Sequence, residues 1–251
     1  MPVGQRHAPP PEPVRAALVR LLAGGLVLGF ASGRGRSLHR ELRAWVPRGL
    51  WDRVLVGMYT GGARVWLAEE VSHVEEIRRP DLSPAAVAGL AEAHARLAAP
   101  PFDRLFVLAR PPAPGQVSVK PRPDRPVPVR SLIALSTAVL GRPPALPVRL
   151  AASAYAIDIV PATVSKAAVA AEVAAAAAFG SAVLAVGDRG EPGGNDFELL
   201  ACVPYSLQRR DARINVVVEE ETHLSLRRRP DPAALPPRPR RSTPGPQRES
   251  R

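Results

Sequence analysis

Polar side chains follow a short apolar run near the end of the chain, and their types suit the binding of a divalent cation. The run from Ala182 to Val186 stops at Gly187-Asp188, and a loop rich in glycine and proline then leads to Asn195-Asp196. Carboxylate and amide oxygens are the hard ligands that Mg²⁺ prefers. Because ligands of open α/β sheets bind outside the carboxyl ends of the strands, we predict that Asp188 and Asp196 hold Mg²⁺ at such an edge.

Two further loops carry groups that suit an anion. Ser32-Gly33-Arg34 follows the apolar run Leu26 to Ala31, and Ser165-Lys166 opens an alanine-rich helical segment. Loop N–H groups at the start of a helix bind anions, and a lysine adds positive charge. Lysine is rare in this chain, since Lys120 is the only other one. The sequence therefore predicts an anion site beside the cation site.

Apolar spacing around these loops predicts alternating helices and strands. Helices are expected over 14–23, 37–45, 83–97, 131–140 and 165–179 and from 197, and strands over 26–31, 54–58, 63–67, 105–108, 116–120, 155–160 and 182–186. Buried strands followed by glycine-rich loops and helices predict an α/β fold with a parallel sheet, and the middle of the chain predicts a separate α+β unit. We expect a discontinuous core over 1–67 and 162–222, an insert over 68–161, and a disordered basic tail over 223–251.

Composition argues against several other kinds of protein. The formal net charge is +11, but eight of the arginines lie from Arg227 onward, and aromatic residues make up only 4% of the chain. Base-stacking surfaces need aromatic side chains, so no nucleic-acid partner is expected. The apolar stretch 167–187 is mostly alanine and is broken by Gly180-Ser181, so no membrane partner is expected either. We expect a cytoplasmic protein, and a single cysteine excludes an internal disulfide.

The order of these motifs resembles that of the haloacid-dehalogenase (HAD) superfamily, in the branch with a C2-type inserted cap that includes sugar-phosphate phosphatases. FASGRG is similar to the second family motif, VPATVSKAAV to the third and GDRGEPGGND to the fourth. The resemblance implies a three-layer, Rossmann-like parallel-sheet core with an inserted α+β cap. It also implies a Mg²⁺-dependent phosphatase, a phosphoric monoester hydrolase whose substrate is a small phosphate ester such as a sugar phosphate.

The resemblance also implies a role for each matched residue. Ser32, Lys166 and Asp188 would be catalytic, with Ser32 holding phosphoryl oxygens and Lys166 neutralising charge in the transition state. Asp188 and Asp196 would be the Mg²⁺ ligands. The residues expected to bind the substrate are Ser32, Gly33, Arg34, Lys166 and Asn195.

The chain departs from the family pattern in two places. The acidic loop has four residues more than the common Gly-Asp-x-x-Asn-Asp, and its glycines favour a bulge that keeps both acids inward. The first motif, Asp-x-Asp-Gly-Thr, is absent, because the first aspartate is Asp52. We therefore expect a chain truncated before its aspartate nucleophile, with little or no activity. The resemblance implies that the first motif lies on a central strand, between the strands expected over 26–31 and 182–186. Without that strand, a slot of roughly 10 Å would separate its two neighbours, twice the spacing of paired strands.

Two other functions stay open at this point. A non-catalytic relative would bind a phosphorylated ligand or a partner without turning it over. An exported or nucleic-acid-associated basic protein would use the segment Ala16 to Ser32, which is similar to a signal peptide, or the arginine-rich tail.

Overall fold

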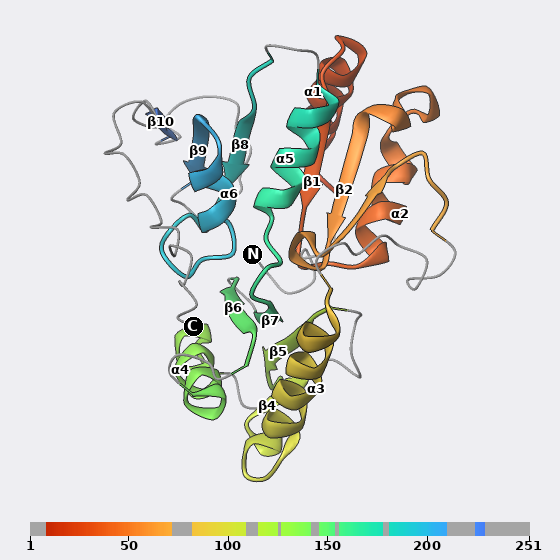
Figure 1. The fold of residues 1–251 in the computed structure, drawn as a ribbon. Coiled ribbons are helices and arrows are strands. Elements are labelled where there is room, and N and C mark those ends of the chain that lie inside the picture. The colour runs from red at the N-terminus through yellow and green to blue at the C-terminus, as the bar shows by residue number, and fades with distance from the viewer. Residues whose placement is uncertain are drawn as a thin grey trace, which may run out of the picture.

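The computed structural model describes residues 9–71, 82–108, 115–124, 127–141, 146–153, 156–177, 181–209 and 224–228 (Figure 1). The helices are α1 (Glu12–Ala23), α2 (Arg36–Trp45), α3 (Pro84–Ala98), α4 (Val129–Leu140), α5 (Ala167–Ala176) and α6 (Phe197–Cys202), with short 3-10 turns η2 (Arg48–Arg53), η3 (Tyr59–Gly61) and η5 (Phe102–Arg104). The strands are β1 (Leu28–Ala31), β2 (Val54–Met58), β3 (Ala63–Trp66), β4 (Phe106–Leu108), β5 (Val117–Pro121), β6 (Val148–Ala152), β7 (Ile157–Pro161), β8 (Leu184–Gly187), β9 (Tyr205–Arg209) and β10 (Leu224–Arg228).

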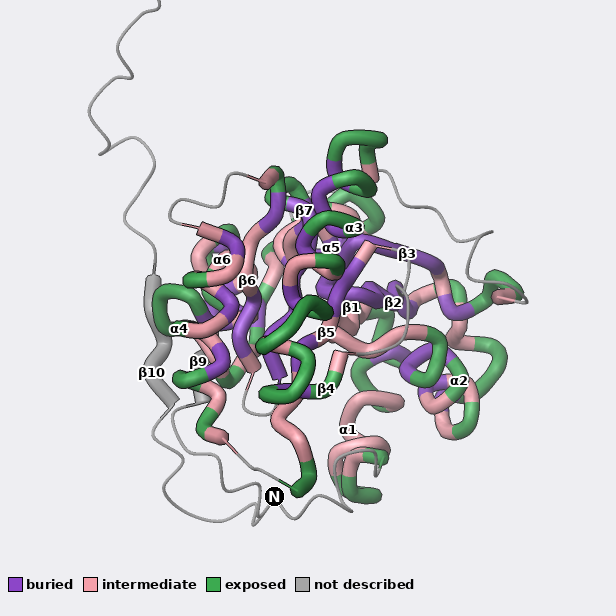
Figure 2. Tube along the Cα trace, turned by 90° about the horizontal axis from the view of Figure 1, so that it is seen from below, coloured by how far each residue is buried: buried purple, intermediate pink, exposed green. Residues whose placement is uncertain are grey.

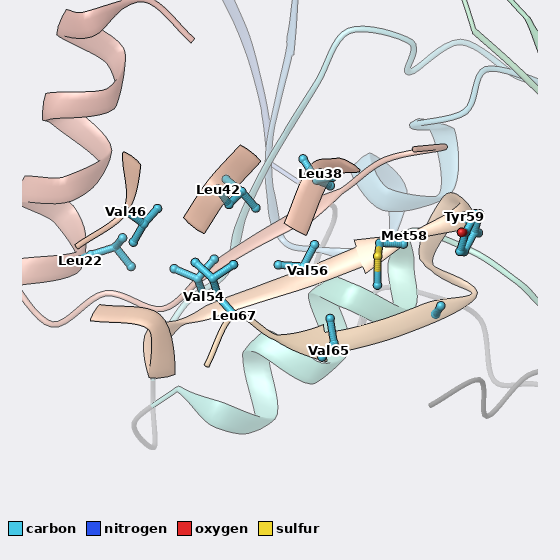
Figure 3. Close-up of a cluster of buried hydrophobic side chains, with 11 residues drawn as sticks. Leu22, Leu38, Leu42, Val46, Val54, Val56, Met58, Tyr59, Val65 and Leu67 are labelled. Atoms are coloured by element: carbon cyan, nitrogen blue, oxygen red, sulfur yellow. The ribbon is translucent and has the colours of Figure 1, made fainter. Parts of the chain in front are cut away.

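The first sheet has the order β1-β2-β3 and forms the centre of one hydrophobic core. β1 runs parallel to β2, β3 runs antiparallel to it, and all five residues of β2 are buried. Leu22 of α1 and Leu38 and Leu42 of α2 pack with Val54 and Val56 (Figure 3). A second cluster joins Val169 and Val173 of α5 to Leu55, so helices cover both faces of this sheet. The result is the layered α/β arrangement that the apolar runs predict.

The middle of the chain builds its own sheet, in the order β4-β5-β7-β6, with every neighbouring pair antiparallel. α3 and α4 pack against it and fill a separate hydrophobic cluster that includes Leu90, Leu132 and Ile159. α3 starts where its sequence predicts, since the Ser83 hydroxyl oxygen accepts a hydrogen bond from the Ala86 N–H. This unit lies at the carboxyl ends of β1 and β8 (Figure 1).

The third sheet contains β8, β9 and β10, with β8 parallel to β9 and β10 antiparallel to it. Within the described residues, β1 and β8 are both edge strands and do not pair with each other. The parallel sheet that we predicted is therefore present in two parts. The residues within β2, β3 and β7 are mostly buried (Figure 2).

Two strands differ from the sequence-based expectation. β6 has an alanine-rich sequence that no strand pattern marks, and it is defined by its pairing with β7. β10 falls inside the range for which we expected disorder, and pairing with β9 orders that backbone. The β-branched run 214–219 and the rest of the basic tail lie outside the described residues. No helix among the described residues has the length and apolar content to cross a membrane.

Candidate active site

A buried ion pair joins the two motifs that the sequence places on α5 and on the acidic loop. Lys166 lies at the N-terminal boundary of α5, and its Nζ is 2.6 Å from Oδ1 of Asp196. The two side chains are only 6% and 7% exposed. A lysine at this end of a helix opposes the helix dipole, so the adjacent carboxylate is what stabilises its charge there. The structure therefore brings these two predicted residues into direct contact.

The acidic loop folds around Asp196. Its Oδ2 accepts hydrogen bonds from the backbone N–H groups of Asp188 (3.0 Å) and Arg189 (3.1 Å). Burial alone raises the pKa of Asp196, but the Lys166 ammonium and these hydrogen bonds outweigh it and hold the pKa below its ordinary value. Partners within the protein therefore satisfy both side-chain oxygens of Asp196. Through the Asp188 and Arg189 N–H groups, Asp196 also fixes the start of the acidic loop.

The pKa of Asp188 is shifted in the opposite direction to that of Asp196. Its side chain is exposed, while partial desolvation by the surrounding loop and the neighbouring Asp196 carboxylate raise its pKa. Lys166 acts in the other direction but does not outweigh these effects. Two carboxyl groups so close together with diverging pKa values are typical of sites with different roles for each acid.

The extra residues of the acidic loop form a bulge. The Asp196 N–H donates to the Arg189 carbonyl oxygen (3.1 Å), and the Gly194 N–H donates to that of Glu191 (2.8 Å). This turn returns the chain to the end of β8 and keeps Asp196 buried, as the glycines of the loop suggest. Only Asp196 faces inward, because Asp188 is exposed. The expectation that both acids face inward is therefore met for Asp196 and not for Asp188, which lies at the surface.

The loop offers oxygen donors that fit Mg²⁺. Asp188 presents an exposed carboxylate, and the Asn195 side-chain oxygen is buried without a hydrogen-bond partner. Both side-chain oxygens of Asp196 already accept hydrogen bonds from the protein. Within the described part of the chain, no three His, Cys, Asp or Glu side chains gather to hold a metal unaided. Since Mg²⁺ commonly binds through one or two carboxylates, waters and phosphate oxygens, this donor set fits such a shared site.

The Ser32 loop begins where β1 ends and is held by the turn after β2. The Ser32 hydroxyl oxygen accepts the Arg34 N–H (3.2 Å), while the Ser32 and Arg34 carbonyl oxygens accept the N–H groups of Thr60 and Tyr59 (2.9 and 3.0 Å). Tyr59 and Thr60 have φ values of 52° and 62°, which non-glycine residues rarely adopt. Such backbone strain persists only where surrounding contacts fix it, and it concentrates at functional sites.

The same turn reaches Lys166. Gly61 has a φ of 90°, and a Cβ built on it would lie 2.5 Å from the Ser165 carbonyl oxygen. Arg64 holds the turn in place: its guanidinium donates to the Gly61 carbonyl oxygen (2.8 Å) and pairs with Glu172 of α5 (3.0 Å). One short turn therefore touches both the Ser32 loop and the Lys166 segment. The acidic loop joins this arrangement through the Lys166–Asp196 pair.

Arg34 is placed differently from the other predicted residues. Its guanidinium pairs with Glu41 of α2 at 2.7 Å, and both side chains are partly buried. This pairing directs the charge toward α2. The role of Arg34 in substrate binding stays a prediction.

Three residues near the Ser32 loop belong to no sequence motif, and the sequence did not predict them as part of the site. Gln116 donates to the Gly33 carbonyl oxygen (3.0 Å) and to the Ser118 hydroxyl (2.9 Å), and Ser118 donates to Asp158 (2.6 Å). A Cβ on Gly33 would lie 2.4 Å from Asp158 Oδ2, so a larger residue there would displace this carboxylate. Ser118 and Asp158 are cross-strand neighbours on β5 and β7. The inserted sheet thus contacts the Ser32 loop through a partly buried polar network, which only the three-dimensional pairing reveals.

Comparison with known proteins identifies the fold. Neither a protein-family model nor a curated protein matches this sequence. The sucrose-phosphatase of Synechocystis sp. PCC6803, solved with sucrose and phosphate, is 18% identical with a TM-score of 0.55, over 80% of this chain and 77% of that one. An N-terminally truncated IMP-nucleotidase of Plasmodium falciparum is 12% identical with a TM-score of 0.51, over 74% of this chain and 58% of that one. This chain therefore shares the fold of these two proteins, an α/β core with a second, inserted α+β unit.

Proposed function

We propose that this chain carries the Mg²⁺-binding and phosphate-binding residues of a HAD-type phosphomonoesterase whose substrate is a small phosphate ester such as a sugar phosphate. The observation that carries the proposal is the buried Lys166–Asp196 pair, fixed beside Asp188 at the end of β8. A turn that contacts the Ser32 loop places this pair next to a second candidate phosphate-binding element. The sucrose-phosphatase likeness supports the substrate class by its fold alone.

In this proposal each residue of the chain has one task. The Ser32 hydroxyl and the Gly33 N–H bind phosphoryl oxygens, and Lys166 balances the negative charge that spreads over them in the transition state. Asp188 and the Asn195 oxygen bind the cation, and Asp196 orients both Lys166 and the Asp188 backbone. Mg²⁺, when bound, neutralises phosphate charge. The inserted sheet contacts the Ser32 loop and shields it from water.

The nucleophile is the group that the matched residues do not provide. Phosphoryl transfer in this family passes through an aspartyl phosphate, and no aspartate precedes Asp52 in the sequence. We therefore propose that residues 1–251 bind Mg²⁺ and phosphate but hydrolyse esters only near the background rate.

A hydrolysis panel of sugar phosphates, nucleotides and p-nitrophenyl phosphate with Mg²⁺ tests this proposal, together with phosphate binding to the same preparation. Binding with background turnover is the expected result. Turnover at rates ordinary for phosphatases would show that a residue within 1–251 serves as the nucleophile. Absence of phosphate binding would contradict the assigned site.

Replacing Asp188 by asparagine is expected to weaken divalent-cation binding by at least about tenfold, because it removes the one exposed carboxylate of the site. Mn²⁺ titration followed by electron paramagnetic resonance measures the affinity. The raised pKa of Asp188 means that protons compete with the metal at a higher pH than for an ordinary aspartate. Glu191→Gln, an exposed acid in the same loop, is the matched control. Equal losses in both variants would show that only general loop charge attracts the ion.

A further inference from the structure

β6 of the inserted unit reaches both segments that carry the buried ion pair of the site. Its last residue, Ala152, accepts the Asn195 N–H (3.1 Å) and forms a parallel bridge with Gly194, so the acidic loop lies against the end of this strand. Further back along β6, the Arg149 side chain contacts the segment before α5 and the first turn of α6. Figure 1 shows β6 on the side of the inserted unit that faces α6. A strand outside the core therefore contacts the surroundings of both charges.

Arg149 holds the segment that carries Lys166. Its Nε and Nη2 both donate to the Val164 carbonyl oxygen (2.9 and 2.5 Å), shortly before Lys166 in the chain. Val164 is buried and lies between β7 and α5, where neither a strand nor a helix fixes the backbone. Gly61 limits this segment as well, since its close approach to the Ser165 carbonyl oxygen leaves no room for a Cβ. Contacts from two distant parts of the chain therefore fix the backbone from which the Lys166 side chain extends.

The same guanidinium also holds the helix that follows Asp196. Arg149 Nη2 is 3.0 Å from Oε2 of Glu198, in the first turn of α6. Burial lowers the pKa of Arg149 below its ordinary value, and the Glu198 carboxylate only partly offsets this. An arginine stays charged under such a shift, so its partners stabilise the charge in this partly buried position. Because a guanidinium presents several N–H groups in a fixed fork, Arg149 can bridge the Lys166 segment and α6 at once.

We propose that Arg149 is a positioning residue, which sets from the inserted unit where Lys166 lies relative to the acidic loop. The Lys166 side chain is only 6% exposed, so in its close-packed surroundings a shift of the backbone moves the ammonium as well. Arg149 does not need to touch the phosphate, because it acts through Val164 and Glu198. Only the consequence for phosphate binding rests on the proposed function.

Nuclear magnetic resonance with lysine-selective ¹⁵N labelling tests the positioning directly, because Lys166 and Lys120 are the only lysines of the chain. In Arg149→Gln, hydrogen exchange of the Lys166 ammonium should speed up at least about fivefold, since the ion pair that protects it loosens. The Lys120 backbone amide on β5 should keep its exchange rate, whereas a general loss of stability would accelerate exchange there too. Arg96→Gln is the matched control, because it removes the same charge from an exposed pair with Glu92 on α3 and should change neither lysine.

Titration of the same variants with inorganic phosphate separates the positioning from the proposed function. Where the wild-type protein binds phosphate, Arg149→Gln should weaken binding at least about fivefold, and Arg96→Gln should not. Faster Lys166 exchange in a protein whose wild type binds no phosphate would overturn the proposed function and leave the positioning standing. Unchanged Lys166 exchange, equal acceleration at Lys120, or phosphate binding by Arg149→Gln as tight as that of the wild type would overturn the positioning.

Glu198→Gln is the second variant, and it decides the question where circular dichroism shows that Arg149→Gln does not fold. It removes a carboxylate that is 44% exposed and leaves the hydrogen bonds from Arg149 to Val164 in place. We expect Lys166 exchange to speed up by about twofold, less than in Arg149→Gln, because a partly exposed ion pair contributes less. No change in Lys166 exchange would overturn the role of Arg149 as a bridge.

Discussion

Lys166→Met is expected to lower the free energy of unfolding near neutral pH by about 3 kcal/mol, because it leaves the Asp196 carboxylate buried without its counter-ion. The methionine keeps much of the side-chain volume, so the loss reports mainly the charge. Lys120→Met is the matched control, since Lys120 is the only other lysine and is partly exposed on β5. Urea denaturation of both variants and the wild-type protein measures the difference. Equal midpoints for the two variants would show that the pair does not stabilise the fold.

The pH dependence of the same variant has a defined sign. In the wild-type protein the pKa of Asp196 is lowered, so its contribution is present above the unfolded value of about 3.9 and is lost as the pH falls through the folded value. Without Lys166, burial dominates and the folded pKa lies above the unfolded one. Acidification from neutral pH should then stabilise Lys166→Met relative to Lys120→Met. A constant difference between the two variants across this range would contradict the account of Asp196.

Gly61→Ala is expected to destabilise the protein by about 3 kcal/mol, because the new Cβ meets backbone and the residue needs a left-handed φ. The Cβ would lie 2.5 Å from the Ser165 carbonyl oxygen at a φ of 90°, and a backbone atom cannot rotate away. Because Ser165 precedes Lys166, the shift should also displace the lysine. Gly49→Ala is the matched control, since a Cβ there meets nothing within 4 Å. Urea midpoints of the two variants compare the costs. A loss no larger than that of Gly49→Ala would show that the 59–61 turn is not tightly fixed.

The helices and the buried strands were accessible from the sequence because local signals mark them. Ser83 precedes a proline and an apolar repeat, and its hydroxyl does cap α3. The glycines after Asp188 predicted a bulge, and the structure has one. β6 could not be found in this way, because Val148–Ala152 has few β-branched residues and is a strand only through its pairing with β7.

The partners of the site side chains were harder to predict from the sequence than the motifs themselves. Lys166 and Asp196 were both expected at the site, but their 2.6 Å contact depends on the folding of the long loop. Nothing in the order of residues shows that Arg34 pairs with Glu41 of the following helix. Gln116 and Asp158 approach Gly33 from the inserted sheet, and a lone glutamine or aspartate on an expected strand carries no signal of such a contact.

Calorimetric titration with inorganic phosphate, at zero and at saturating Mg²⁺, tests most directly whether the Ser32 loop, Lys166 and the acidic loop form one site. Two ligands that share a site stabilise each other, so phosphate should bind at least about tenfold more tightly with Mg²⁺ present, and Asp188→Asn should abolish this coupling. Phosphate affinity that is independent of Mg²⁺, or coupling that survives in Asp188→Asn, would contradict the account.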